Sequence, residues 1–191
     1  MTHLGNVQVE FGNAAKPLCL QLKSPRFYIP NLYGLFKPFD VQIIELESTL
    51  NDIEPVSLPS NDFYFIENKE LVTVTLLNEH KQRLRSNRHE KCTKIHMGKR
   101  CVRQYLDKSR IPAPGLQNLS SIEEASVLCT TEYETIPGES GGPLMQKLPS
   151  GKWALVGIVS GTLRGFRNYF IQSEFVSTAG HLNWINSIIL Q

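Results

Sequence analysis

Apolar and polar residues alternate at the start of the chain. In the stretch "NVQVEFG", Val7, Val9 and Phe11 fall on one face, and Gln8 and Glu10 fall on the other. A repeat of two residues is typical of a β-strand with one buried face. Further runs are rich in β-branched or aromatic residues and are bounded by Gly, Pro, Asn or Lys, which also predicts strands. These runs cover residues 40–47, 71–77, 153–161 and 168–175.

Only the C-terminal segment, residues 177–191, shows a helical pattern. Leu182, Ile185, Ile188 and Ile189 recur at spacings of three and four residues, so one apolar stripe is expected to pack against the body of the protein. Turn signals interrupt the rest of the chain at short intervals. Many short strands with few helices predict an all-β barrel or sandwich. A polar, turn-rich seam at about 57–70 separates two groups of strands.

Composition places the chain among ordinary globular proteins. It has 191 residues, of which 41% are hydrophobic and 20% are charged, enough for one large domain or two small ones. No apolar run approaches the length of a membrane span, so no membrane partner is expected. The start "MTHLGNVQVEF" has no charged region followed by an apolar one, and we therefore predict no signal peptide in this sequence.

Charge is distributed unevenly along the chain. The net charge of +2 is too small to indicate a nucleic-acid partner, but basic residues cluster in one segment. A solvated ribbon or loop is the favoured interpretation of this segment, and a patch for anions or polyanions is the alternative. Aromatic residues are not interleaved there, which argues against binding of single-stranded nucleic acid. The cluster comprises Lys81, Arg83, Arg85, Arg88, Lys91, Lys94, Lys99, Arg100 and Arg103.

The four cysteines are Cys19, Cys92, Cys101 and Cys129. No two of them have CxxC spacing, so neither a zinc site nor a thioredoxin motif is expected, and no metal or cofactor is predicted. Their even number fits disulfides in a secreted protein and equally fits buried free thiols. A glycosylation sequon begins at Asn118. Together these features favour an oxidising compartment.

The most informative stretch is "TIPGESGGPL", residues 135–144, in which glycines surround Ser140. Glycine clusters occur where the backbone must turn tightly or approach another group closely. A tight turn is one explanation. The other is that the backbone amides themselves are functional. Acyl transfer needs a nucleophile, a base and donors for the developing oxyanion, and the N–H groups of Gly138 and Ser140 are suited to the last task.

The stretch "GESGGPL" resembles the nucleophile loop of the chymotrypsin-like serine proteases, usually GDSGGP. The resemblance implies a chymotrypsin-type double six-stranded β-barrel with a C-terminal helix. The first barrel, residues 1–62, is expected to be incomplete, and the second barrel with its closing helix is expected over 63–191. It also implies a Ser/His/Asp triad in the chain order His, Asp, Ser.

Two segments supply the other members of that triad. The stretch "FDVQIIELE", followed by "VSLP", resembles the family's strand and loop around the aspartate, which implies a catalytic role for Asp40. A turn cap is the alternative for this residue. The stretch "THLGNVQVEFG" resembles the family's "AHC…IQVRLG", which implies that His3 is the general base. The alternative is an exposed histidine near the start of the chain.

The C-terminal half extends the resemblance. "WALVGIVSG" is similar to the family's "GIVSWG", which implies that Ser160 and Gly161 pair with the substrate backbone. The position of Glu134 implies a specificity pocket that favours Lys or Arg before the cut, with a surface glutamate as the alternative. The stretch "SVLC" resembles the family's "MIC", which implies a disulfide between Cys129 and Cys101.

The sequence also departs from the family. The segment that precedes the histidine in the family has no counterpart here, Glu139 replaces the usual aspartate without that residue's usual partner, and Gly161 replaces a tryptophan. The cysteine expected at Ile136 is also missing. The working hypothesis is a secreted, monomeric serine endopeptidase that acts on polypeptides, meets protein inhibitors and needs no cofactor. The alternative is a catalytically inactive homologue that binds proteins or polyanions.

Overall fold

The structure is a computed structural model of the whole chain. It describes residues 7–11, 18–22, 25–30, 40–47, 49–51, 53–59, 71–78, 85–92, 95–97, 101 and 126–190. His3 and most of the polar seam at 57–70 lie outside these residues, and so does much of the basic segment. The division of the chain near residue 62 therefore stays a prediction.

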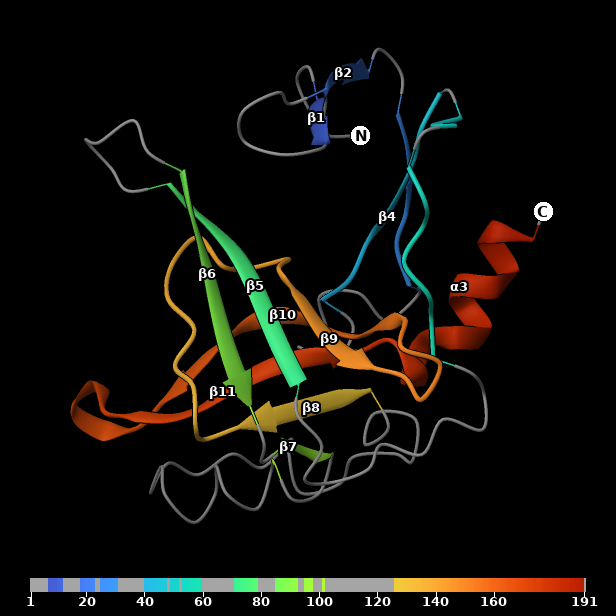
Figure 1. The fold of residues 1–191 in the computed structure, drawn as a ribbon. Coiled ribbons are helices and arrows are strands. Elements are labelled where there is room, and N and C mark those ends of the chain that lie inside the picture. Colours follow the sequence, from blue (N-terminus) through green and yellow to red (C-terminus); the bar gives the residue numbers. More distant parts are fainter. Residues whose placement is uncertain are drawn as a thin grey trace.

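An antiparallel sheet of seven strands dominates the fold (Figure 1). Its spatial order is β6-β5-β9-β10-β11-β8-β7, so that the long strand β10 lies at the centre. The bounds of the strands are β5 Leu71–Asn78, β6 Arg85–Cys92, β7 Ile95–Met97, β8 Val127–Thr130, β9 Pro143–Lys147, β10 Trp153–Arg164 and β11 Phe170–Ser177. The predicted strands over 71–77, 153–161 and 168–175 are thereby confirmed. The β5–β6 pair also shows that residues 85–92 of the basic segment form a ribbon, one of the two forms given by the favoured interpretation.

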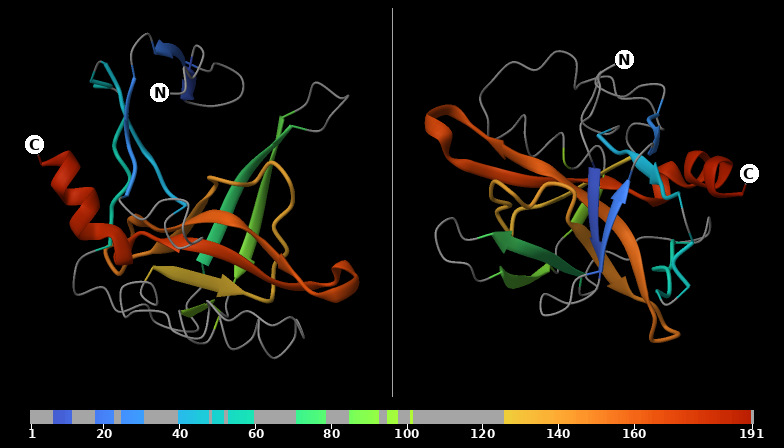
Figure 2. Two further views of the ribbon diagram at one scale, coloured as in Figure 1. Left: turned by 180° about the vertical axis from the view of Figure 1, so that it is seen from behind. Right: turned by 90° about the horizontal axis from the view of Figure 1, so that it is seen from above.

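The N-terminal part contributes two separate antiparallel ribbons. Strand β1 (Val7–Phe11) pairs with β2 (Leu18–Leu22), and β3 (Arg26–Tyr28) pairs with β4 (Ile43–Glu45). Figure 2 shows both ribbons on the same side of the large sheet, with the β3–β4 ribbon beside the C-terminal helix. The strand predicted over 40–47 is shorter than expected. Its first residues leave the ribbon and approach β10 instead, where Asp40 finds a hydrogen-bond partner.

The core lies against the large sheet where β5, β8, β9, β10 and β11 meet. Its apolar side chains come from strands that are distant in sequence, as sheet packing requires. Gly157 allows a close approach of these side chains, because a Cβ there would lie 3.3 Å from both the Leu144 and Phe175 side chains. The buried cluster consists of Leu71, Ile95, Leu128, Tyr133, Leu144, Ala154, Val156, Val159 and Phe175.

The C-terminal helix is shorter than its apolar pattern predicted. Strand β11 continues through Ser177, a 3₁₀ turn follows, and helix α3 spans Leu182–Ile189. Leu182 and Ile185 are buried as expected, but Ile189 is 56% exposed. The last turn of α3 extends past the sheet, so the stripe reaches the core only through its first part (Figure 1). No helix in the described ranges is long and apolar enough to cross a membrane.

The expected disulfide between Cys101 and Cys129 is confirmed, with the two Cα atoms 5.8 Å apart. Both residues are buried, and Cys129 lies on β8. The bridge therefore joins strand β8 to Cys101, which lies 28 positions earlier in the sequence. The side chains of Cys19 and Cys92 lie outside the described part of the chain.

Removing this disulfide is expected to destabilise the fold. The bridge joins residues with a sequence separation of 28 and so restricts the conformations of the unfolded chain. Because its loss raises the conformational entropy of the unfolded chain, the free energy of unfolding should fall by about 2–4 kcal/mol. Urea unfolding of a Cys101→Ser, Cys129→Ser variant measures this loss. Wild-type protein in reductant should then fall to the stability of the variant. Equal stability of oxidised wild type and variant would contradict the expectation.

His181 predicts a dependence of stability on pH. Burial lowers the pKa of its imidazole below the ordinary 6.5, opposed by a hydrogen bond to the Ser177 carbonyl. Because the unfolded chain takes up the proton first, the free energy of unfolding should fall as the pH decreases below about 6.5. A His181→Gln variant should lose this part of the pH dependence. Parallel profiles for wild type and variant between pH 7.5 and pH 5 would refute the expectation.

Candidate functional site

The loop between β8 and β9 carries Ser140, and its glycines have a conformational purpose. Gly138 and Gly141 have φ values of +99° and +82°, in the left-handed region that other residues rarely adopt. A Cβ at either position would meet nothing within 4 Å. Glycine is therefore favoured at these two positions by the backbone conformation and not by a lack of space for a side chain.

Backbone hydrogen bonds fix this loop to the central strand. Gly141 N–H donates to the Val159 carbonyl, and Val159 N–H donates to the Gly142 carbonyl, each at 2.8 Å. The amides of Gly138 and Ser140 donate no hydrogen bond to any group in the described part of the chain. These two N–H groups are the predicted oxyanion donors, and they are not committed elsewhere among those residues.

Glu139 is buried beside Ser140, with only 1% of its surface exposed. Its Oε2 atom accepts hydrogen bonds from the Tyr133 hydroxyl and from the Ile136 amide, the latter at 2.8 Å. A carboxylate tolerates burial only when donors satisfy its oxygens. The family's aspartate pairs with a partner that has no counterpart in this sequence. In the structure, the loop itself supplies two donors to Glu139 instead.

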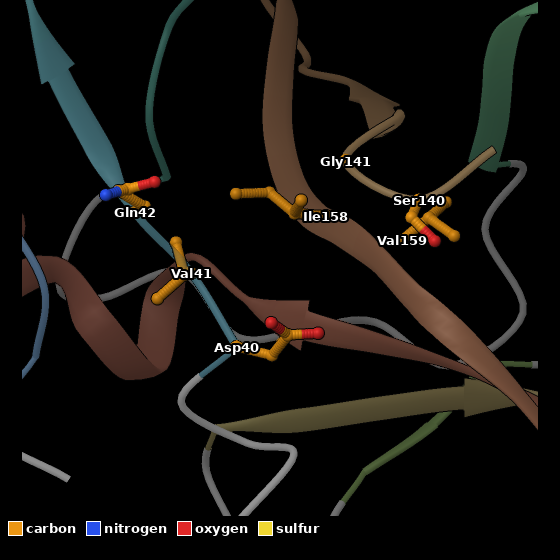
Figure 3. Close-up of a pocket in the computed structure, with 7 residues that line it drawn as sticks. All are labelled: Asp40, Val41, Gln42, Ser140, Gly141, Ile158 and Val159. Carbon is orange, nitrogen blue, oxygen red and sulfur yellow. The ribbon is translucent and has the colours of Figure 1, made fainter. Parts of the chain in front are cut away.

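Asp40 reaches the site from the segment that precedes β4. Its Oδ2 accepts a hydrogen bond of 2.9 Å from the Ser160 hydroxyl on β10. Asp40 and Ser140 line one cavity of about 380 Å³. In Figure 3, Asp40, Val41 and Gln42 form one side of it, and Ser140 lies on the other side with residues of β10. The structure thus brings together the predicted nucleophile and the predicted acid of the triad.

Two of the predicted roles have no structural counterpart in the described residues. His3, the predicted base, lies outside them, so its role stays a prediction. Pairing of Ser160 and Gly161 with a substrate backbone also stays a prediction. The structure adds a different role for Ser160, because its side chain holds Asp40. No repeat or spacing in the sequence indicates that Ser160 and Asp40 are in contact.

A second cavity, of about 220 Å³, opens on the other side of Ser140. Its lining includes Thr135, Thr162 and Arg164. Glu134, the predicted acid of the specificity pocket, forms an ion pair with Arg164. Sequence reasoning missed Arg164, whose position at the end of β10 carried no signal. Within the described residues, no group of three or more metal-ligating side chains occurs.

The buried carboxylate makes a stability prediction. Glu139→Gln places an amide N–H₂ or a weaker acceptor against the two donors, so we expect a loss of about 1–3 kcal/mol in the free energy of unfolding. Tyr133→Phe should cause a similar loss, and the two losses should be less than additive, as a double-mutant cycle would show. Glu134→Gln is the matched control, and its effect should stay within about 0.5 kcal/mol because that side chain is partly exposed. An effect of Glu139→Gln no larger than the control's would refute the assignment.

Comparison with known proteins supports the fold independently of these contacts. No family model matches the sequence. Among solved structures, the chain is similar to that of a scabies mite inactivated protease paralogue, S-I1. The TM-score is 0.60 at 16% sequence identity, and the match covers 87% of this chain and 68% of the mite protein. An identity this low compares folds and not activities.

The antiparallel sheets, the short C-terminal helix and this structural match agree with the architecture expected from the nucleophile loop. The chain has the all-β fold of the chymotrypsin-like serine proteases.

Proposed function

We propose that this protein is a serine-type endopeptidase. The observation that carries the proposal is that Ser140 and Asp40, which come from opposite parts of the chain, line the same cavity. The hydroxyl of Ser160 orients the Asp40 carboxylate, as the acid of a triad requires. The amides of Gly138 and Ser140, which donate to no group among the described residues, add the donors that acyl transfer needs.

The proposed reaction follows from these groups. The Ser140 hydroxyl oxygen attacks the scissile carbonyl carbon while His3 accepts the hydroxyl proton. Asp40 stabilises the resulting imidazolium and holds its tautomer. The amides of Gly138 and Ser140 bind the oxyanion of the tetrahedral intermediate. When the C–N bond breaks, His3 returns the proton to the leaving amine, and water then hydrolyses the acyl-enzyme by the same steps.

A second candidate is a catalytically inactive homologue that binds a protein or a polyanion. The similar mite protein is an inactivated protease paralogue, which favours this alternative. The ion pair between Glu134 and Arg164 also departs from an open acidic pocket. In this alternative the fold serves as a binding module and Ser140 has no chemical role.

The setting that we propose is extracellular. A buried disulfide is typical of proteins that fold in oxidising compartments. The proposed substrate is a polypeptide, and the protein would act as a monomer without a cofactor. Protein inhibitors that insert a peptide loop into the site would be natural partners.

Labelling with a fluorophosphonate probe tests the enzyme directly, because the probe reacts only with an activated serine. We expect labelling of the wild type and none of Ser140→Ala. Labelling should be lost in His3→Ala and slowed by about 10⁴-fold in Asp40→Asn, whose amide favours the wrong tautomer of the base. Ser150→Ala is the matched control, since Ser150 lies exposed in the turn between β9 and β10.

Each variant should keep the unfolding transition of the wild type, so that lost labelling reports on chemistry. A well-folded wild type that takes up no probe would exclude the endopeptidase and leave the binding module. Salt-sensitive retention on a polyanion column would then support the polyanion-binding form of that module.

A further inference from the structure

We infer that Arg164 converts the second cavity into a site for an uncharged carboxamide side chain, Asn or Gln, and excludes Lys and Arg. This inference deepens the proposed function, on which it rests for the meaning of the cavity as the site of the residue before the cut. It differs from the preference that Glu134 alone would predict.

Arg164 is held at two points of its guanidinium group. Nη2 contacts the Glu134 carboxylate, and Nη1 donates to the Asn168 carbonyl at 3.0 Å. That carbonyl belongs to the turn after β10, in which Arg167 and Asn168 have φ values of 63° and 62°. The turn is closed by a hydrogen bond of 3.0 Å from Asn168 N–H to the Gly165 carbonyl. The guanidinium is therefore anchored by the fold as well as by the ion pair.

The charge that the cavity presents is that of Arg164. This residue is part of the cavity lining, whereas Glu134, its ion-pair partner, is not. A guanidinium group stays protonated at any ordinary pH. A Lys or Arg side chain entering the cavity would meet a like charge in its lining, and the Glu134 carboxylate is already neutralised by that charge. An acidic side chain would meet Arg164 but would lie close to Glu134.

The remaining polar lining suits a group that both donates and accepts. The Thr162 hydroxyl donates to the Thr135 carbonyl at 2.6 Å, and the two threonine hydroxyl oxygens lie 2.5 Å apart. Thr162 commits its hydrogen to the carbonyl, so Thr135 is the donor between the hydroxyls. Both oxygens then offer only lone pairs to a ligand. A carboxamide N–H₂ fits these acceptors, and its carbonyl fits the N–H groups of Arg164.

Two small ligands of the same shape test the inference without requiring catalysis. Benzamidine is a cation and benzamide is its neutral carboxamide analogue, and ligand-observed NMR titration measures the affinity of each. We expect wild-type protein to bind benzamide at least fivefold more tightly than benzamidine. Arg164→Ala should reverse this order and raise the affinity for benzamidine at least tenfold, because the Glu134 carboxylate loses its counter-charge and can pair with the ligand.

Two further variants identify the cause of the reversal. Adding Glu134→Gln to Arg164→Ala should abolish the gain in benzamidine binding. Lys147→Ala removes one positive charge from an exposed position on β9, outside the cavity lining, and should leave both affinities unchanged. Wild-type protein that prefers benzamidine, or that binds neither ligand at millimolar concentration, would overturn the inference.

Peptide substrates link the cavity to the proposed activity. If fluorophosphonate labelling succeeds, peptides with Gln or Asn before the cut should be hydrolysed with a higher kcat/KM than their Lys or Arg counterparts. The Arg164→Ala variant should reverse this preference. If labelling fails, the endopeptidase is excluded, but the benzamide and benzamidine titrations still decide what the cavity selects.

Discussion

The buried carboxylate of Glu139 is the constraint on which the site depends. A carboxyl group that is 1% exposed must be satisfied by donors, and two of these are the Tyr133 hydroxyl and the Ile136 amide. Meeting both donors draws the chain between them into a tight loop. The Glu139 carbonyl then accepts from Gly142 N–H at 2.9 Å, which closes the turn around Ser140. The exposed serine is therefore positioned by a charge buried directly beside it.

Strand β10 fixes the other residues of the site relative to Ser140. Val159 pairs with the glycines that follow Ser140, and the next residue, Ser160, holds Asp40. Further along the same strand, Thr162 and Arg164 line the second cavity. One continuous strand thus sets the spacing between the loop, the acid and the cavity. Sites built on strands are held more precisely than sites built on loops, which makes β10 a suitable frame for this site.

Sequence patterns predicted much of the fold but few of the side-chain contacts in the site. Alternation and β-branched runs predicted β1, β5, β10 and β11, and the family resemblance supplied the disulfide. The contact between Asp40 and Ser160 spans 120 positions and leaves no trace in periodicity. The same holds for Arg164 and Glu134, 30 positions apart. Such pairs depend on how two strand ends meet in space. The exposure of Ile189 has a similar origin, since a helical stripe does not reveal where the sheet beneath it ends.

The loop around Ser140 also bears on the choice between an enzyme and a binding module. The fold itself does not distinguish them, since the similar mite protein is an inactivated paralogue. A binding module needs the sheet and its core, but it does not need Gly138 in a left-handed conformation. Glycine at this position costs chain entropy on folding, and the space around it would accept a side chain. A binding module also gains nothing from two amides in an exposed loop that donate to no group in the described part of the chain. Acyl transfer uses such amides as donors to the oxyanion, and the conformation of Gly138 helps to present them. Their presence beside a serine that shares a cavity with Asp40 is the structural basis of the proposal that this loop is catalytic.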